Sequence, residues 1–368
     1  MAKTLVNIIS EQTVPNYLFI REVFEIGDGL LFISSKKMKD RIDWLVDTLG
    51  WANCQIDTII FNHDGDEEKW DLMHESVSKH LSSDKVYFVN LTGGTKYMAL
   101  ATQSIFGKFN AKFFYIPYPK NQILDITNSQ TIDIQYRVGV NEYFRLCGQN
   151  VRCSGEIVGT PEYTASFLGR FLGDFKGQQF QVIDKLRAYR EAKKGIDVAL
   201  VEQKEDEPKK PQIVDLSTFL SSISFQSTEQ LNKSEIQYLT GGWFEEYVYN
   251  YINDYIHPND ILIGVKVEST NNDLDVVFTL GNKLYVIECK TGVERKGMLN
   301  EIVYKASALK SSLFALSARS YIFALSEDNQ DWALAAQNMN ITYCGRTHFT
   351  DTGKLNVLLD YIQNLSNN

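Results

Sequence analysis

The 368-residue sequence lacks several features that would place it in a common class of protein. No apolar run approaches the roughly 20 residues of a membrane span, and the N-terminus has none of the regions of a signal peptide. The five cysteines are scattered without a CxxC pair, so neither a zinc site nor a disulfide framework is expected. We therefore expect a cytoplasmic globular protein with free thiols.

A net positive charge and two nucleotide-binding sequence motifs are also missing. The net charge of −9 argues against a protein that coats nucleic acid through a general basic surface, although it permits a local basic groove. The patterns GxxxxGK[ST] and GxGxxG do not occur, so an ATPase or a dehydrogenase is poorly supported.

Residues 1 to about 118 alternate short apolar runs with segments of helical length. This alternation predicts βαβ crossovers and a Rossmann-like parallel sheet that helices cover on both faces. The expected strands are Leu5–Ile9, Leu30–Ile33, Ile56–Phe61, Val86–Val89 and Lys112–Pro117. Residues 123–126 and 132–136 predict an added antiparallel hairpin, and we assign residues 1–145 to this α/β domain.

A second α/β pattern begins near residue 236. A helix over 243–256 precedes three strands over 261–267, 274–280 and 284–289, and further helices and strands alternate to the C-terminus. The last two of the three strands meet at a tight turn, Gly281-Asn282. We assign residues 236–368 to a second α/β domain and residues 146–235 to a connector that we expect to be helical.

Charged residues appear at the end of the predicted strand 284–289. Side chains alternate along a strand, so Glu288 and Lys290 share a face with the apolar residues that precede them. A carboxylate and an amine that continue a core-facing register are costly unless they are paired or bind a metal. Pairing through the turn at 281–282 places Asp275 opposite Glu288, and two carboxylates with the Cys289 carbonyl suit Mg²⁺ or Mn²⁺. Lys290 would then orient water or neutralise charge on a phosphate.

The order helix, Asp strand, Glu-x-Lys strand, helix resembles the PD-(D/E)xK nuclease superfamily over about residues 240–345. The resemblance implies metal-dependent cleavage of phosphodiester bonds, with Asp275, Glu288 and Lys290 as catalytic residues. It also implies an acid on the first helix, either Glu245 or Glu246, of which we favour Glu245. Leu274 stands where the superfamily often has proline, and either Tyr304 or Lys305 could support the site from the following helix.

Polar residues follow four predicted strands of the first domain, at the sheet edge where ligands of open α/β sheets bind. The clearest loop, Asn90-Leu-Thr-Gly-Gly-Thr-Lys96, opens a helix whose N–H groups can meet phosphate, and its glycines permit close backbone approach. A helix cap would explain this loop alone, but four polar strand ends favour binding. The expected ligand contacts are Ser10, Glu11, Gln12, Thr13, Asn16, Ser35, Lys36, Asn62, Thr92, Gly93, Gly94, Thr95 and Lys96.

The loops at 92–96 and 10–13 resemble those of the CARF sensor domain of CRISPR-associated proteins, over about residues 1–140. A CARF domain followed by a PD-(D/E)xK domain is similar to the Card/Can group of CRISPR ancillary nucleases. In that group a cyclic oligoadenylate, commonly cyclic tetra-adenylate, binds across a CARF homodimer and activates the nuclease. The resemblance thus implies a homodimer, Mn²⁺ or Mg²⁺ dependence, and cleavage of single-stranded DNA or RNA, or nicking of duplex DNA, in type III CRISPR antiviral defence.

Two alternatives remain open at this point. The protein could be a non-catalytic nucleotide-sensing regulator that binds nucleic acid, or a constitutive repair or restriction-type nuclease whose first domain is only structural. The presence of Asp275, Glu288 and Lys290 together favours an enzyme, because a domain that only binds nucleic acid has no need of carboxylates near phosphate.

Overall fold

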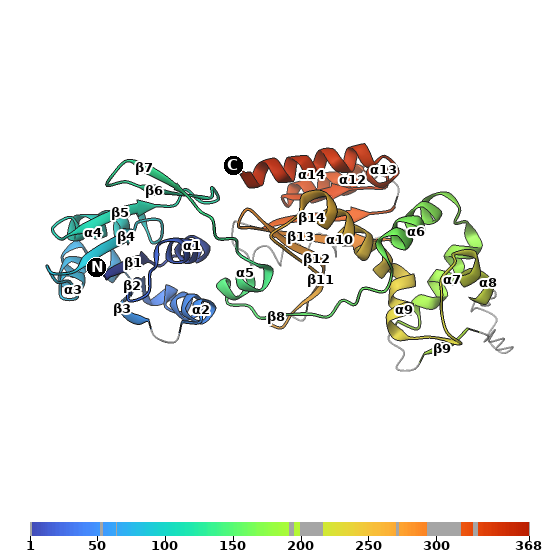
Figure 1. Cartoon of the computed structure of the whole chain (residues 1–368), viewed down its shortest axis with the longest axis horizontal. Coiled ribbons are helices and arrows are strands. Elements are labelled where there is room, and N and C mark those ends of the chain that lie inside the picture. The colour runs from blue at the N-terminus through green and yellow to red at the C-terminus, as the bar shows by residue number, and fades with distance from the viewer. Residues whose placement is uncertain are drawn as a thin grey trace.

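The computed structural model shows three parts in a row, with the first α/β domain at one end, a second α/β domain in the middle and a helical part at the other end (Figure 1). The described residues are 2–51, 54–63, 65–190, 195–198, 216–269, 272–292, 318–326 and 330–367. Among them, no helix is both long and apolar enough to cross a membrane.

The first domain is built on a seven-stranded sheet in the order β3-β2-β1-β4-β5-β6-β7. The first five strands in this order are parallel, and β6 and β7 form the added antiparallel hairpin, as predicted. The strands are β1 Lys3–Ile8, β2 Gly29–Ser35, β3 Gln55–Phe61, β4 Val86–Asn90, β5 Ala111–Tyr115, β6 Gln122–Asp125 and β7 Gln130–Asp133. The helices are α1 Val14–Val23, α2 Asp40–Leu49, α3 Trp70–Ser78 and α4 Lys96–Phe106, with short 3-10 turns η1 Lys36–Met38 and η2 Asp66–Glu68.

One helix of this domain is not in the prediction. α1 begins directly after the loop at 10–13, and its residues from Val14 to Ile20 are all buried. It therefore lacks the alternation of apolar and polar faces that marks a surface helix in a sequence. Asn16 lies in the first turn of α1 rather than in a loop, and its amide donates to the Ile8 carbonyl at 3.0 Å.

The second domain is built on a six-stranded sheet in the order β15-β14-β13-β12-β11-β8. β13, β14 and β15 are parallel, and the other neighbours are antiparallel. The strands are β8 Val151–Cys153, β11 Asp260–Val267, β12 Asn272–Leu280, β13 Lys283–Lys290, β14 Arg319–Ala324 and β15 Ile341–Cys344. The helices are α10 Trp243–Ile256, α12 Gln330–Asn338, α13 Thr347–Thr350 and α14 Thr352–Asn367.

The helical part packs into the core of the second domain. It comprises α6 Pro161–Gly173, α7 Gly177–Arg187, α8 Leu216–Ser222, α9 Lys233–Gln237 and the π-turn η3 Tyr238–Gly242, with a short ladder of β9 Ile196–Asp197 and β10 Gln230–Leu231. The ring of Trp243 lies 4.8 Å from that of Phe167 and 5.0 Å from that of Phe171, centroid to centroid. Within the described residues of 146–235 the longest elements are helices, and β8 is also present, which at three residues is too short to show a strand pattern in the sequence.

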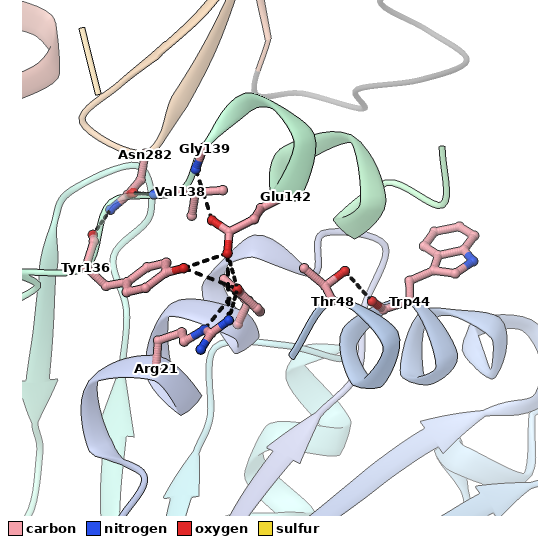
Figure 2. A network of polar contacts seen from close by, with 9 residues as sticks. Arg21, Trp44, Thr48, Tyr136, Val138, Gly139, Glu142 and Asn282 are labelled. Carbon is pink, nitrogen blue, oxygen red and sulfur yellow. Dashed lines mark hydrogen bonds and ion pairs between the residues drawn. The ribbon is translucent and has the colours of Figure 1, made fainter. Parts of the chain in front are cut away.

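A short helix, α5 Val140–Leu146, joins the two α/β domains. Its Val140 and Phe144 belong to one apolar core that also includes Tyr17 of α1 and Val265 of β11. At its N-terminus, Glu142 accepts hydrogen bonds from the Tyr136 hydroxyl at 2.6 Å and the Gly139 N–H at 3.0 Å (Figure 2). It also accepts one from the Tyr17 hydroxyl at 2.7 Å. The Val140 N–H also donates to Asp260 Oδ2 of β11 at 2.7 Å, so the contact between the domains is both apolar and hydrogen-bonded.

Candidate functional site

The β12–β13 hairpin carries the predicted catalytic residues. Its turn places Gly281 at φ 55° and Asn282 at φ 59°, as a two-residue type I′ turn requires. The ladder runs from Leu280 and Lys283 to Val276 and Ile287, which puts Asp275 opposite Glu288 one step further on. The register therefore agrees with the one that the turn predicts.

The two faces of β13 lie in different cores, as strand alternation predicts. Leu284 and Val286 belong to the core that is shared with the first domain. Tyr285, Ile287 and Cys289 belong to the core beneath α10 and α14. Glu288 continues the first of these faces and is only 8% exposed, so its charge needs a nearby partner.

Lys290 supplies that partner. Its ammonium Nζ lies 2.7 Å from Glu288 Oε1, 3.1 Å from the Cys289 carbonyl oxygen and 3.4 Å from Asp275 Oδ2. Burial by itself would lower the pKa of Lys290, but the carboxylates of Asp275 and Glu288 outweigh it and hold that pKa above its usual value. Asp275 Oδ2 also accepts the Cys289 N–H at 2.6 Å, which fixes the carboxylate against β13.

This arrangement tests whether the site fits a metal ion. The three oxygens that surround the Lys290 ammonium are the same three that the sequence predicts as metal ligands. They already converge on a positive charge, and all are hard oxygen donors of the kind that Mg²⁺ and Mn²⁺ prefer. Within the described residues, no three Asp, Glu, His or Cys side chains gather as a metal-binding group. Two carboxylates and one backbone carbonyl nevertheless fit a divalent ion whose remaining ligands are water molecules.

The two acids at the start of α10 have different surroundings. Glu246 is 2% exposed, and its carboxylate accepts the N–H groups of Val158 at 2.7 Å and Gly159 at 3.0 Å. It therefore holds the chain that enters α6. Burial and the negative charge of Asp275 raise the pKa of Glu245 to about 8, which places Glu245 electrostatically within the site. The preference for Glu245 as the helix acid stays a prediction, and this electrostatic coupling is in its favour.

Two arginines of the helical part lie near the end of β13 and Glu245, and we did not predict them from the sequence. Arg190, just after α7, donates from Nε to Thr240 Oγ1 at 2.6 Å, and its charge acts to lower the pKa of Glu245. A Cβ on Gly292, two residues beyond Lys290, would lie 3.7 Å from Arg187 Nη2. No local pattern marks these residues, because the fold alone returns α7 to the end of β13. The predicted supporting residues Tyr304 and Lys305 lie outside the described residues.

The predicted ligand loops meet at the carboxyl edge of the first sheet. A cavity of 170 Å³ opens there. Five predicted ligand residues line it, namely Ser10, Gln12, Asn16, Thr92 and Gly93. Pro15 at the start of α1 completes this side of the cavity, and Tyr115, Ile116 and Tyr118 close the other. We did not predict these last three residues from the sequence. Tyr115 ends β5, and Ile116 and Tyr118 follow it at the same edge, where the rule that ligands bind at strand ends could have found them.

The other predicted contacts are absent from the lining of this cavity. They are Glu11, Thr13, Ser35, Lys36, Asn62, Gly94, Thr95 and Lys96. Thr13 is buried and donates from its hydroxyl to the Leu146 carbonyl of α5. Thr95 caps α4 by accepting the Met98 N–H at 3.2 Å. Helix capping therefore accounts for part of the loop, and the side chains of Lys36 and Lys96 are exposed.

The glycines of the loop are required by packing against β1. A Cβ on Gly93 would lie 1.8 Å from the Ile8 carbonyl oxygen, which no side chain could tolerate. Gly94 has φ +72°, in the left-handed region, and its Cβ would lie 2.4 Å from Ile8 Cγ2. The loop thus presses directly onto the end of β1, beside the cavity.

Two family models match this sequence. The Card1 CARF domain matches residues 4–143, and the Card1-like endonuclease domain matches residues 232–362. No match was found among curated proteins.

Solved structures share the fold along the whole chain. Protein VC1899 from Vibrio cholerae has a TM-score of 0.78 at 17% identity, over 98% of this chain and 97% of that chain. Can2 from Sulfobacillus thermosulfidooxidans, solved in complex with cyclic tetra-adenylate, has a TM-score of 0.73 at 19% identity, over 98% of both chains. A type III CRISPR defence DNA nuclease activated by cyclic oligoadenylate has a TM-score of 0.54 at 18% identity, over 89% of this chain and 46% of that chain.

The matched domains occur in the order that the sequence predicts, with the sensor-type domain first and the endonuclease domain second. The hairpin with Asp275, Glu288 and Lys290 lies within the endonuclease match, and the cavity at the sheet edge lies within the CARF match. The chain therefore belongs to the CRISPR-associated CARF-domain nucleases of the Card/Can group.

Proposed function

We propose that this protein is a metal-dependent endonuclease that a cyclic oligoadenylate, cyclic tetra-adenylate in particular, activates in type III CRISPR antiviral defence. The observation that carries the proposal is the convergence of Asp275, Glu288 and the Cys289 carbonyl on one positive charge, in a chain that also holds a polar cavity in a CARF domain. The complex of Can2 with cyclic tetra-adenylate supports the choice of activator.

In this proposal the side chains of the hairpin hold the metal and the scissile phosphate. Asp275 and Glu288, with the Cys289 carbonyl, would hold Mn²⁺ or Mg²⁺, which when bound supplies positive charge that stabilises the transition state of phosphodiester hydrolysis. Lys290 would donate hydrogen bonds to a phosphate oxygen or to the attacking water. The charges of Asp275, Lys290 and Glu288 act on the pKa of Glu245 on α10, so its carboxyl group would orient a water molecule in this proposal.

Arg187 and Arg190 would bind the substrate backbone beside the metal site. Guanidinium groups pair well with phosphate, and such contacts fix the position of a strand without reading its sequence. This explains how a chain with a net charge of −9 can bind nucleic acid, since the positive charge is local. The proposed substrates are single-stranded DNA or RNA, which the enzyme would cleave, and duplex DNA, which it would nick.

The size of the cavity favours a homodimer. Pockets that enclose drug-sized ligands have volumes of about 300–1,000 Å³, whereas the CARF cavity has 170 Å³. A ring of four adenylates cannot fit inside one such cavity, but it can lie across two of them that face each other in a dimer. We propose that the exposed Lys36 and Lys96 then meet its phosphates.

A cleavage assay tests the proposal. The protein is incubated with labelled single-stranded DNA, single-stranded RNA and supercoiled plasmid in Mn²⁺, with and without cyclic tetra-adenylate. We expect Glu288→Gln to lower the rate at least about 100-fold, while Glu75→Gln, which alters an exposed carboxylate on α3, leaves it unchanged. Undiminished cleavage by Glu288→Gln would refute the site, and equal cleavage with and without activator would refute the sensing role.

A further inference from the structure

The turn between β12 and β13, Gly281-Asn282, is held by hydrogen bonds from the CARF domain. Asn282 is fully buried, and its amide donates to Asn121 Oδ1 at 2.8 Å and to the Tyr136 carbonyl at 3.1 Å. Its Oδ1 accepts the Val138 N–H at 2.8 Å (Figure 2). In return, the Asn121 amide donates to the Gly281 carbonyl at 3.2 Å. Because a buried amide is costly to leave unbonded, these bonds fix the turn to the CARF domain.

The same turn is bonded to the lining of the CARF cavity. Tyr118 lines that cavity and donates from its hydroxyl to the Asn282 carbonyl at 3.0 Å. Tyr136, whose carbonyl accepts from Asn282, also joins the turn to the Glu142 network of α1 and α5 (Figure 2). A ligand that displaces the 118–121 segment would therefore act on the turn directly.

Two cavities next to the turn leave room for such a displacement. One cavity of 530 Å³ has Tyr118 and Lys283 in its lining, and another of 520 Å³ has Asn121 and Gly281. Both cavities are lined by residues of the two domains. The turn thus bridges the domains between two open spaces, while α5 holds them together elsewhere.

The hairpin connects this turn to the metal site. Glu288 lies about 20 Å along β13 from Asn282, at roughly 3.3 Å per residue. β13 is paired on both sides, with β12 and with β14, so it moves as part of a sheet rather than bending alone. A shift of the turn would therefore change the position of Asp275 and Glu288 relative to α10 and the arginines.

We propose that Asn121 and Asn282 are positioning residues through which an activator in the CARF cavity sets the geometry of Asp275 and Glu288. The proposal rests on the proposed function and names how the same site is regulated. Asn121 and Asn282 are absent from the lining of the CARF cavity and from the bonds around Lys290. Each acts by fixing where the β12–β13 hairpin sits.

Two variants each remove part of the hydrogen bonding between the CARF domain and the turn, and both keep the turn. Asn121→Ala deletes both bonds that Asn121 makes to the turn. Asn282→Gly deletes the side-chain bonds, and glycine accepts the φ of 59° without strain, so the type I′ turn persists. Asn259→Ala is the matched control, because Asn259 Oδ1 accepts the Gly281 N–H at 2.8 Å from within the endonuclease domain.

The full-length protein is assayed with Mn²⁺ and a single-stranded oligonucleotide, with and without saturating cyclic tetra-adenylate. Activator binding is followed by calorimetry, and hydrogen–deuterium exchange is measured at the amides of β12 and β13. We expect both cross-domain variants to bind the activator and to lose about tenfold or more of the ratio between activated and basal rates, within the range of allosteric couplings. Asn259→Ala should keep that ratio.

An unchanged ratio in Asn121→Ala and Asn282→Gly would overturn the proposal. An equal loss in Asn259→Ala would overturn it as well, because the stability of the turn would then explain the effect, and so would loss of activator binding. Exchange separates this proposal from the proposed function. If the activator protects the hairpin amides from exchange and this protection disappears in Asn121→Ala, the coupling is supported even if no nucleic acid is cut. If the protein cleaves nucleic acid but the activator leaves hairpin exchange unchanged, the coupling is contradicted and the proposed function is not.

Discussion

Replacing Glu142 by Gln should weaken the attachment of α5, the helix that joins the two domains, to the rest of the first domain. The carboxylate accepts three hydrogen bonds, from Tyr17, Tyr136 and the Gly139 N–H, and Arg21 lies 3.7 Å away. A glutamine amide has one acceptor oxygen and no charge, so it can keep the hydroxyls on that oxygen but turns an N–H group towards the Gly139 N–H. The variant therefore loses one hydrogen bond outright and weakens the others.

The size of the effect follows from the type of bond. A hydrogen bond to a charged group contributes about 1.5–3 kcal/mol, and the Glu142 side chain is only 27% exposed, so solvent screens it little. We expect the free energy of unfolding to fall by about 2–3 kcal/mol at pH 7. For a domain the size of the first α/β domain, this corresponds to a thermal midpoint lowered by about 5–10 °C. Glu75→Gln, at an exposed pair on α3, should leave the midpoint unchanged.

The pH dependence gives a second measure of the same bond network. Burial by itself would raise the pKa of Glu142, but the hydrogen bonds from Tyr136, Gly139 and Tyr17 and the charge of Arg21 hold it below its usual value. A depressed pKa stabilises the folded state above the unfolded pKa of about 4.3, and this stabilisation is lost as the pH falls through the folded pKa. Thermal unfolding followed by circular dichroism should therefore show the difference between wild type and Glu142→Gln shrinking below about pH 4. A midpoint like that of Glu75→Gln at pH 7, or a difference that persists at low pH, would refute the reasoning.

Three further predictions concern the CARF cavity, the proposed phosphate contact of Arg190, and the two acids at the start of α10. Gly93→Ala should lower activator affinity at least about tenfold by calorimetry, because its Cβ would lie 1.8 Å from the Ile8 carbonyl oxygen; unchanged affinity would show that the loop is not part of the binding site. Arg190→Gln should raise KM more than it lowers kcat and reduce the salt slope of substrate binding by about one, and an unchanged slope would exclude a phosphate contact. Glu246→Ala should cost about 2–4 kcal/mol in unfolding experiments, since it leaves two N–H groups unbonded, whereas Glu245→Ala should lower cleavage without lowering stability; the reverse pattern would exchange their roles.

The sequence predicts much of this fold because its strongest local patterns are not overridden by tertiary structure. The apolar runs of β1 to β5 and the turn at Gly281-Asn282 lead directly to the observed sheets and register. α1 was missed because residues from Val14 to Ile20 are all buried and show no periodicity. β8 was missed because three residues carry too little pattern, and only its pairing with β11 defines it as a strand.

In the candidate sites too, the residues that could be predicted are those that a local pattern brings together. Asp275, Glu288 and Lys290 could be predicted because one hairpin brings them together, so that their proximity follows from a local turn. The arrangement of Arg190 beside Thr240, and that of Tyr118 beside Asn282, depends on contacts between residues 50 and 164 positions apart. No local pattern encodes such contacts, since they arise only when whole elements pack.

The most direct test of the central claim is the rate at which the wild-type protein cleaves one labelled single-stranded oligonucleotide under single-turnover conditions in Mn²⁺, measured with and without cyclic tetra-adenylate. We predict that the activator raises this rate at least about tenfold and that chelation of the metal abolishes it. Equal rates with and without the activator, or cleavage that survives chelation, would contradict the account of a metal-dependent nuclease under the control of its CARF domain.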